Sequence, residues 1–142
     1  MTAEKEISII FNATLLAQRK FGEITFRLFS NGIYYVHVPK YQKIGLQVIY
    51  AGIQFIEDNG GGKFYNIFHF DSFSDVDPEV REWASDSEGN NYTICDAIVI
   101  GSLSQKIISD FYLRFNKPAK PTKILYSLEK AIAWIEQQRT NQ

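Results

Sequence analysis

The sequence predicts one α/β domain whose sheet is mixed but mostly parallel, with about five strands, an N-terminal β-hairpin and four helices. Two apolar segments with period-two alternation, EITFRLF and IYYVHV, flank the pair Asn31-Gly32, and both turn residues tolerate the positive φ of a tight hairpin. Beyond the hairpin, segments of helical periodicity alternate with short apolar runs, which favours right-handed crossovers between parallel strands. The 142 residues, of which 45% are hydrophobic, fit a single globular core.

The first half of the chain is expected to contain an N-terminal segment, the hairpin, a helix and a strand. Residues 1–22 give no clear pattern and are predicted as an N-terminal arm or a short strand, and the domain is placed at residues 23–139. After the hairpin, residues 41–58 are predicted as a helix with two neighbouring apolar stripes. One stripe can cover the sheet, and the other then needs a neighbouring helix, a partner chain or a ligand. Residues 64–70 are predicted as a strand rich in aromatic rings.

The second half of the chain continues the alternation. Asp77 is expected to cap a short helix that has Pro78 in its first turn. Ser102 and Gln105 form a capping box at the start of a later helix. The expected elements are a helix at 78–84, a strand at 97–100, a helix at 103–115, a strand at 122–126 and a final helix from 128.

Composition and charge exclude several classes of protein. The net charge of −1 gives no general attraction to polyanions, so we expect no nucleic-acid binding. No apolar run approaches the roughly 20 residues of a membrane span, and the acidic N-terminus does not resemble a secretion signal. Cys95 is the single cysteine, which favours a reducing compartment. We therefore expect a cytoplasmic protein without a membrane span.

The motifs that could indicate chemistry do not fit their templates. The GGGK stretch at 60–63 lacks the hydroxyl residue of a phosphate loop and leads from a helix into a strand, which is the wrong order. The carboxylates of residues 71–79 lack the spacing of a Ca²⁺ loop and are ordinary near a helix N-terminus. His37, His69 and Cys95 are too scattered for a zinc site. We therefore expect no catalytic residues, no metal, no cofactor and no enzyme activity.

The C-terminal half carries a resemblance to a known superfamily. A short apolar strand at 97–100 leads into a segment that ends in FYLRFNKP, which is followed by PTKILYS and by a helix carrying EKAIAWI. Together with the order of elements over residues 23–138, these segments resemble the STAS-like superfamily, which includes the anti-anti-sigma factors and the SpoIIAA-like proteins. The resemblance implies a STAS-like fold and a small regulatory or protein-interaction module that is not an enzyme.

The resemblance also bears on the candidate contact residues. In the anti-anti-sigma branch of this superfamily, the resemblance implies that a Ser or Thr at the start of the helix after the third strand is phosphorylated. The matching stretch here is Asp77-Pro78-Glu79-Val80, which keeps the acidic residue but has no hydroxyl. We therefore expect an interaction domain without the usual phosphoacceptor serine. The expected contact region consists of Ser72, Ser74, Asp75, Asp77 and Glu79.

Two kinds of partner remain open. The first is a second copy of the chain, in a homodimer, or another protein, because acidic residues gather at 71–96 and basic residues at 106–130. The alternative is a small apolar or lipid-like ligand, carried or sensed between helix 41–58 and strand 64–70. SpoIIAA-like proteins resemble lipid-binding folds in which a helix moves to open an apolar pocket. A cationic rim for such a ligand or for an anion would consist of Arg114, Lys117, Lys120 and Lys123.

Overall fold

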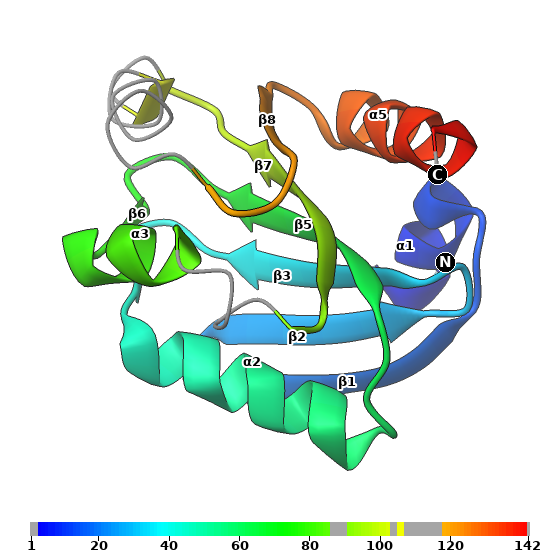
Figure 1. Cartoon of the computed structure of the whole chain (residues 1–142), viewed down its shortest axis with the longest axis horizontal. Helices are drawn as coiled ribbons and strands as arrows, with labels where there is room; N and C mark the ends of the chain where they lie inside the picture. The colour runs from blue at the N-terminus through cyan, green and yellow to red at the C-terminus, as the bar shows by residue number, and fades with distance from the viewer. Residues whose placement is uncertain (1–2, 86–90, 103–104, 107–117, 142) are drawn as a thin grey trace.

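The computed structural model describes residues 3–85, 91–102, 105–106 and 118–141 (Figure 1). Within this part of the chain, the centre of the fold is a six-stranded sheet with the order β1-β2-β3-β5-β7-β8. The strands are β1 (Leu15–Phe21), β2 (Ile24–Phe29), β3 (Ile33–Val38), β5 (Phe64–Phe70), β7 (Thr93–Val99) and β8 (Thr122–Leu125). The pairs β1–β2 and β2–β3 are antiparallel, whereas β3, β5, β7 and β8 run parallel.

The strand count corrects one expectation. The α/β class and the antiparallel hairpin followed by parallel strands are confirmed, but the sheet has six strands rather than about five. The additional strand is β1, whose residues are mostly exposed at the edge of the sheet, so its sequence lacks the alternation that identifies a strand. The segment before it forms helix α1 (Ala3–Phe11). Phe11 anchors this helix, because its ring stacks on Phe29 with the centroids 4.3 Å apart.

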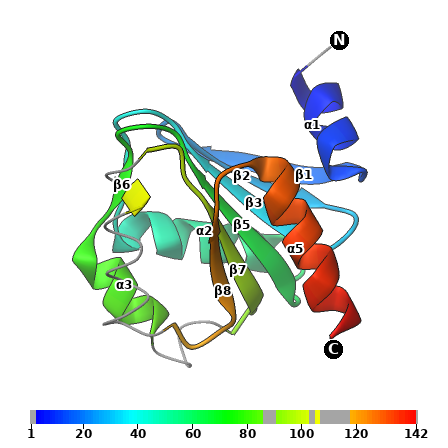
Figure 2. The ribbon, with the colours of Figure 1, turned by 90° about the horizontal axis from the view of Figure 1, so that it is seen from above.

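The helices cover both faces of the sheet. Among the described residues they are α1, α2 (Leu46–Asp58), α3 (Pro78–Ala84) and α5 (Leu128–Thr140). Figure 2 shows α2 and α3 on one side of the sheet and α1 and α5 on the other. Most of the helix expected at 103–115 lies outside the described residues. None of the helices in the described part is long and apolar enough to cross a membrane.

The sheet separates two apolar cores. Ile67 and Ala97 of the central strands, together with Ile135 of α5, are fully buried in the core beneath α1 and α5. Phe26 and Phe55 belong to the core beneath α2 and α3. The parallel strands therefore contribute side chains to both cores, as is usual for a sheet covered on both faces.

Helix α2 carries the two apolar stripes that the sequence predicts, and the stripes have different surroundings. Val48, Gly52 and Phe55 are buried against the sheet. Ile49 and Ile53, one helical turn apart, are partly buried and line a cavity. The second stripe therefore faces an internal space.

Candidate functional site

A cavity of about 150 Å³ lies between α2, α3 and the central strands β5 and β7. Most of its wall is apolar. The wall includes Val48, Ile49, Ile53, Phe68, Trp83 and Ile98. A concave, mostly apolar space with a few polar groups is the usual form of a small-molecule site.

The burial of residues on the central strands shows that this space is not filled by side chains. β5 and β7 lie in the interior of the sheet, where both faces are normally covered. Nevertheless Phe68 of β5 and Asp96 and Ile98 of β7 are only partly buried, and all three line the cavity. Their incomplete burial shows that other side chains do not fill the space beside them.

Polar residues gather at one end of the cavity because of the strand register. Asn66 of β5 lies directly opposite Asp96 of β7, which in turn lies opposite Thr122 of β8. The Asn66 Nδ2 atom donates to Thr93 Oγ1 and to Asp96 Oδ1, both at 3.0 Å. All four residues line the cavity. Asn66 is 5% exposed, and its Oδ1 atom has no hydrogen-bond partner among the described residues.

Asp96 is the titratable group of this polar end. Burial raises the pKa of Asp96 to about 6, although the hydrogen bond from Asn66 and the charge of Lys120 both act in the opposite direction. A carboxyl group with this pKa still carries a negative charge at neutral pH. The polar end therefore combines a carboxylate with an amide oxygen.

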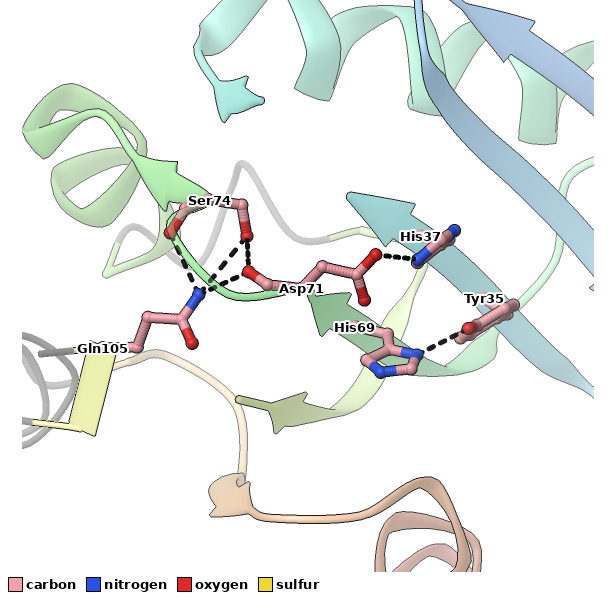
Figure 3. A network of polar contacts seen from close by, with 6 residues as sticks. All are labelled: Tyr35, His37, His69, Asp71, Ser74 and Gln105. Carbon is pink, nitrogen blue, oxygen red and sulfur yellow. Dashed lines mark hydrogen bonds and ion pairs between the residues drawn. The ribbon is translucent and has the colours of Figure 1, made fainter. Parts of the chain in front are cut away.

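A second feature lies beside the cavity, where the loops that follow β3, β5 and β7 meet at the carboxyl ends of the strands. The first two loops pair through a short parallel ladder between β4 (Lys43–Ile44) and β6 (Asp75–Val76). Gln105 joins the third loop to them, since its Nε2 atom donates to the carbonyl oxygens of Asp71 at 2.8 Å and Ser74 at 3.1 Å (Figure 3). We call the segments 39–45 and 71–79 the loop edge.

Two aromatic rings project from the loop edge into solvent. Tyr41 and Phe73 are 72% and 65% exposed, and their rings stack with centroids 5.5 Å apart. The Lys40 ammonium lies over both rings, 5.7 Å and 5.4 Å from their centroids. Both aromatic residues have a left-handed backbone, with φ of 66° and 65°. Bulky side chains rarely adopt this conformation, and such strain is concentrated at functional sites.

Two histidines lie next to the loop edge, and Figure 3 shows their partners. His37 Nε2 lies 2.9 Å from Asp71 Oδ2, and His69 Nδ1 lies 2.7 Å from the Tyr35 hydroxyl. Burial, followed by the charge of His37, lowers the pKa of His69 below its ordinary value. The described residues contain no group of three or more His, Cys, Asp or Glu side chains that could hold a metal ion. Each histidine thus has a hydrogen-bonding partner in the described part of the chain, Asp71 for His37 and Tyr35 for His69.

The residues of the expected contact region have different environments. Ser74 is 3% exposed, and its hydroxyl donates to the Asp71 carbonyl at 2.5 Å, so it holds the loop together rather than facing a partner. Asp77 occupies the N-cap position of α3, but its carboxylate pairs with Lys43 at 2.9 Å instead of bonding to the helix. Ser72 and Asp75 are partly buried, and Glu79 is exposed.

The expected cationic rim is described only in part. Arg114 and Lys117 lie outside the described residues. Lys120 is partly buried near Asp96, and Lys123 is exposed on β8. Of the two, Lys120 is the one that lies close to the cavity.

Several residues of the site were not identified from the sequence. Asn66, Thr93 and Asp96 come together through strand pairing, and Tyr41 and Phe73 through the contact of two loops. The available signal was a polar residue in the middle of a mostly apolar strand. These residues are Asn66 in FYNIFHF and Asp96 in TICDAIV. A polar side chain at such a position must find a partner or face a cavity.

Comparison with known proteins gives one match. Residues 27–139 match a sequence family described as "Domain of unknown function (DUF7793)". No curated protein and no solved structure matches the chain. The matched range includes both the cavity and the loop edge.

Proposed function

Since the chain belongs to the DUF7793 family, whose function is unknown, we propose a function from the cavity: the protein is a non-catalytic domain that binds a small, mostly apolar molecule. The observation that carries the proposal is the cavity of about 150 Å³ on the α2 face of the sheet. An apolar cavity of about 150 Å³ can hold a benzene-sized molecule. Phe68 and Ile98 are only partly buried where they line this space, which is consistent with room for a ligand beside them.

The position of the cavity suggests how a ligand would act. Ile44, Ser74 and Val76 line the cavity and also belong to the loop edge. A ligand that contacts them would stabilise the loop edge by mass action, because it binds the folded arrangement. We therefore propose a ligand carrier or sensor that signals through this edge. The proposal includes the resemblance to STAS-like and SpoIIAA-like domains. The order of elements supports it, because a hairpin is followed by alternating helices and parallel strands.

Binding can be tested with small one-ring or short-chain probes. We expect toluene, benzyl alcohol and 1-hexanol to shift the methyl NMR signals of Ile49, Ile53 and Ile98 in a saturable way. At a ligand concentration about tenfold above Kd, the stabilisation is about 1.4 kcal/mol, which corresponds to a rise in Tm of roughly 5 °C. The substitution Ile98→Phe fills the cavity and should abolish both effects.

A matched substitution separates cavity filling from a general effect of added volume. Leu16 is 65% exposed on β1, so Leu16→Phe adds an aromatic ring away from the cavity and should leave binding unchanged. The proposal fails if none of the three probes gives a saturable shift and native mass spectrometry of protein from its own host shows no bound small molecule.

A second candidate function is self-association through the loop edge, as expected from the sequence. The exposed stack of Tyr41 on Phe73 favours self-association. The backbone of both residues is strained, and the loop holds their rings in solvent, where they can contact a partner. Lys40 and the exposed Glu79 add opposite charges to the same edge, as a self-complementary contact requires. The proposed partner is a second copy of the chain.

This candidate is tested by light scattering. The double variant Tyr41→Asn/Phe73→Asn removes the rings, whereas asparagine tolerates the left-handed backbone, so the fold should persist. We expect the unmodified chain to form a dimer and the double variant to be monomeric with a similar Tm. Tyr126→Asn is the control, because Tyr126 is a 54% exposed aromatic residue elsewhere on the surface. A monomeric unmodified chain at high concentration would rule out self-association.

A further inference from the structure

The polar end of the cavity has a definite hydrogen-bonding character. An amide group has two N–H donors, and both N–H donors of Asn66 are used by Thr93 and Asp96. This arrangement fixes the amide orientation and leaves Oδ1 as an acceptor with no partner among the described residues. A buried acceptor without a partner is unfavourable, because it has lost its hydrogen bonds to water without replacing them. Asn66 Oδ1 has almost no surface accessible to water, so a ligand in the cavity can donate to it only after a small shift of the neighbouring side chains, and such a hydrogen bond would recover much of this cost.

We propose that the cavity selects an apolar molecule with a hydroxyl or amine head that donates to Asn66 Oδ1 beside Asp96, and that it discriminates against a carboxylate head. This inference rests on the proposed ligand-binding function. The carboxylate of Asp96 lies within hydrogen-bonding distance of the Asn66 amide, so a second carboxylate would be repelled there. A hydroxyl or ammonium group meets acceptors instead of a like charge.

Two cations near the cavity, Lys120 and Arg81, are the alternative anchors for an anionic head. The charge of Lys120 acts on Asp96 and is therefore partly offset by it. Arg81 of α3 also lines the cavity, and its charge acts on Lys43 at the loop edge. A carboxylate ligand would have to place its head toward Arg81. Titration with benzoate tests whether a carboxylate head binds toward Arg81.

The experiment compares ligands of similar size at about pH 8, where Asp96 is ionised. Toluene, benzyl alcohol and benzoate are titrated into the full chain, and Kd is obtained from the methyl shifts of Ile98. We expect benzyl alcohol to bind at least about tenfold more tightly than benzoate, because the alcohol donates a hydrogen bond to a buried acceptor whereas the carboxylate meets the like charge of Asp96.

Two variants locate the hydrogen bond. Asn66→Ala should weaken benzyl alcohol binding about fivefold, the equivalent of about 1 kcal/mol, and change toluene binding less than twofold. Thr93→Val removes a partner of Nδ2 but retains Oδ1, so it should keep the preference for benzyl alcohol. If Asn66→Ala does not fold, the comparison of benzyl alcohol with toluene in the unmodified chain still tests the donor head, since an apolar cavity disfavours benzoate in any case; benzyl alcohol that binds no more tightly than toluene would overturn the inference.

The outcomes distinguish this inference from the proposed function. If toluene binds but benzyl alcohol has no advantage over benzoate, the inference is wrong and the ligand-binding function stands. If benzoate binds best and Arg81→Leu removes its binding, the cavity selects acids through Arg81 and the inference is also wrong. If no probe binds and native mass spectrometry of protein from its own host shows no bound small molecule, the proposed function itself fails.

Discussion

Replacing Gly52 with alanine should lower the free energy of unfolding by about 1–3 kcal/mol, the usual cost of overpacking a core. Gly52 lies in the interior of α2 and faces the sheet, and a Cβ atom at this position would overlap the Tyr34 hydroxyl oxygen. Tyr34 is 5% exposed and lines the cavity, so relief of the overlap would require its ring to shift out of the core toward that space. The expected loss occurs even though alanine is favoured over glycine in a helix by about 1 kcal/mol.

The substitution Tyr34→Phe provides the matched control, because it removes the overlapping oxygen. The added Cβ atom would then meet Phe26 Cε1 and Tyr34 Cζ at 3.5 Å, which is ordinary van der Waals contact. The double variant should therefore be more stable than Gly52→Ala alone, with a coupling energy of about 1–3 kcal/mol in urea denaturation. If Gly52→Ala is as stable as the unmodified chain, α2 does not pack this closely on the sheet and the cavity wall is misplaced.

The stability of the protein should fall as Asp96 ionises. The pKa of Asp96 is about 6 in the folded chain, compared with an ordinary value of 3.8. Between these values the folded state binds more protons than the unfolded state, so the free energy of unfolding decreases as pH rises through this window. A difference of about two pKa units corresponds to about 3 kcal/mol. Asp96→Asn should lack this decrease, and urea denaturation between about pH 4 and pH 7 measures it.

His69 must be separated from this effect. Its pKa is lowered in the folded chain, so the unfolded state binds more protons just below pH 6.5 and stability rises with pH in that range. This trend opposes that of Asp96. The difference between the unmodified chain and Asp96→Asn cancels the contribution of His69, which both proteins share. A difference that does not change with pH would show that Asp96 is not buried at the end of the cavity.

The sequence predicts those parts of the fold that depend on local pattern. Asn31-Gly32 identifies the hairpin, since few other dipeptides suit its turn. The two stripes of residues 41–58 predict a helix with a second apolar face, and the structure gives that face a cavity. For residues 1–22 the sequence predicts only an arm or a short strand, whereas the structure has helix α1 followed by strand β1, because an exposed edge strand and a short helix anchored by Phe11 have little periodicity of their own.

The site depends on relations between distant segments, which local pattern does not contain. Asn66 meets Asp96 because β5 and β7 are neighbours in this register, and a shift of one residue would turn these side chains to the other face. The stack of Tyr41 on Phe73 likewise requires the β4–β6 ladder. Ser74, expected as a contact residue, is instead buried beneath the same loop. A hydroxyl in a polar loop can have either role, and sequence alone does not distinguish them.

A crystal structure of the full chain with benzyl alcohol tests the central proposal most directly. We expect electron density for one ring between α2 and strands β5 and β7, next to Ile53 and Ile98, with the hydroxyl oxygen within hydrogen-bonding distance of Asn66 Oδ1. Density for the ring with its hydroxyl elsewhere would retain the binding function and exclude the selection of a donor head. A cavity filled by the protein's own side chains, with no bound ligand, would contradict the account.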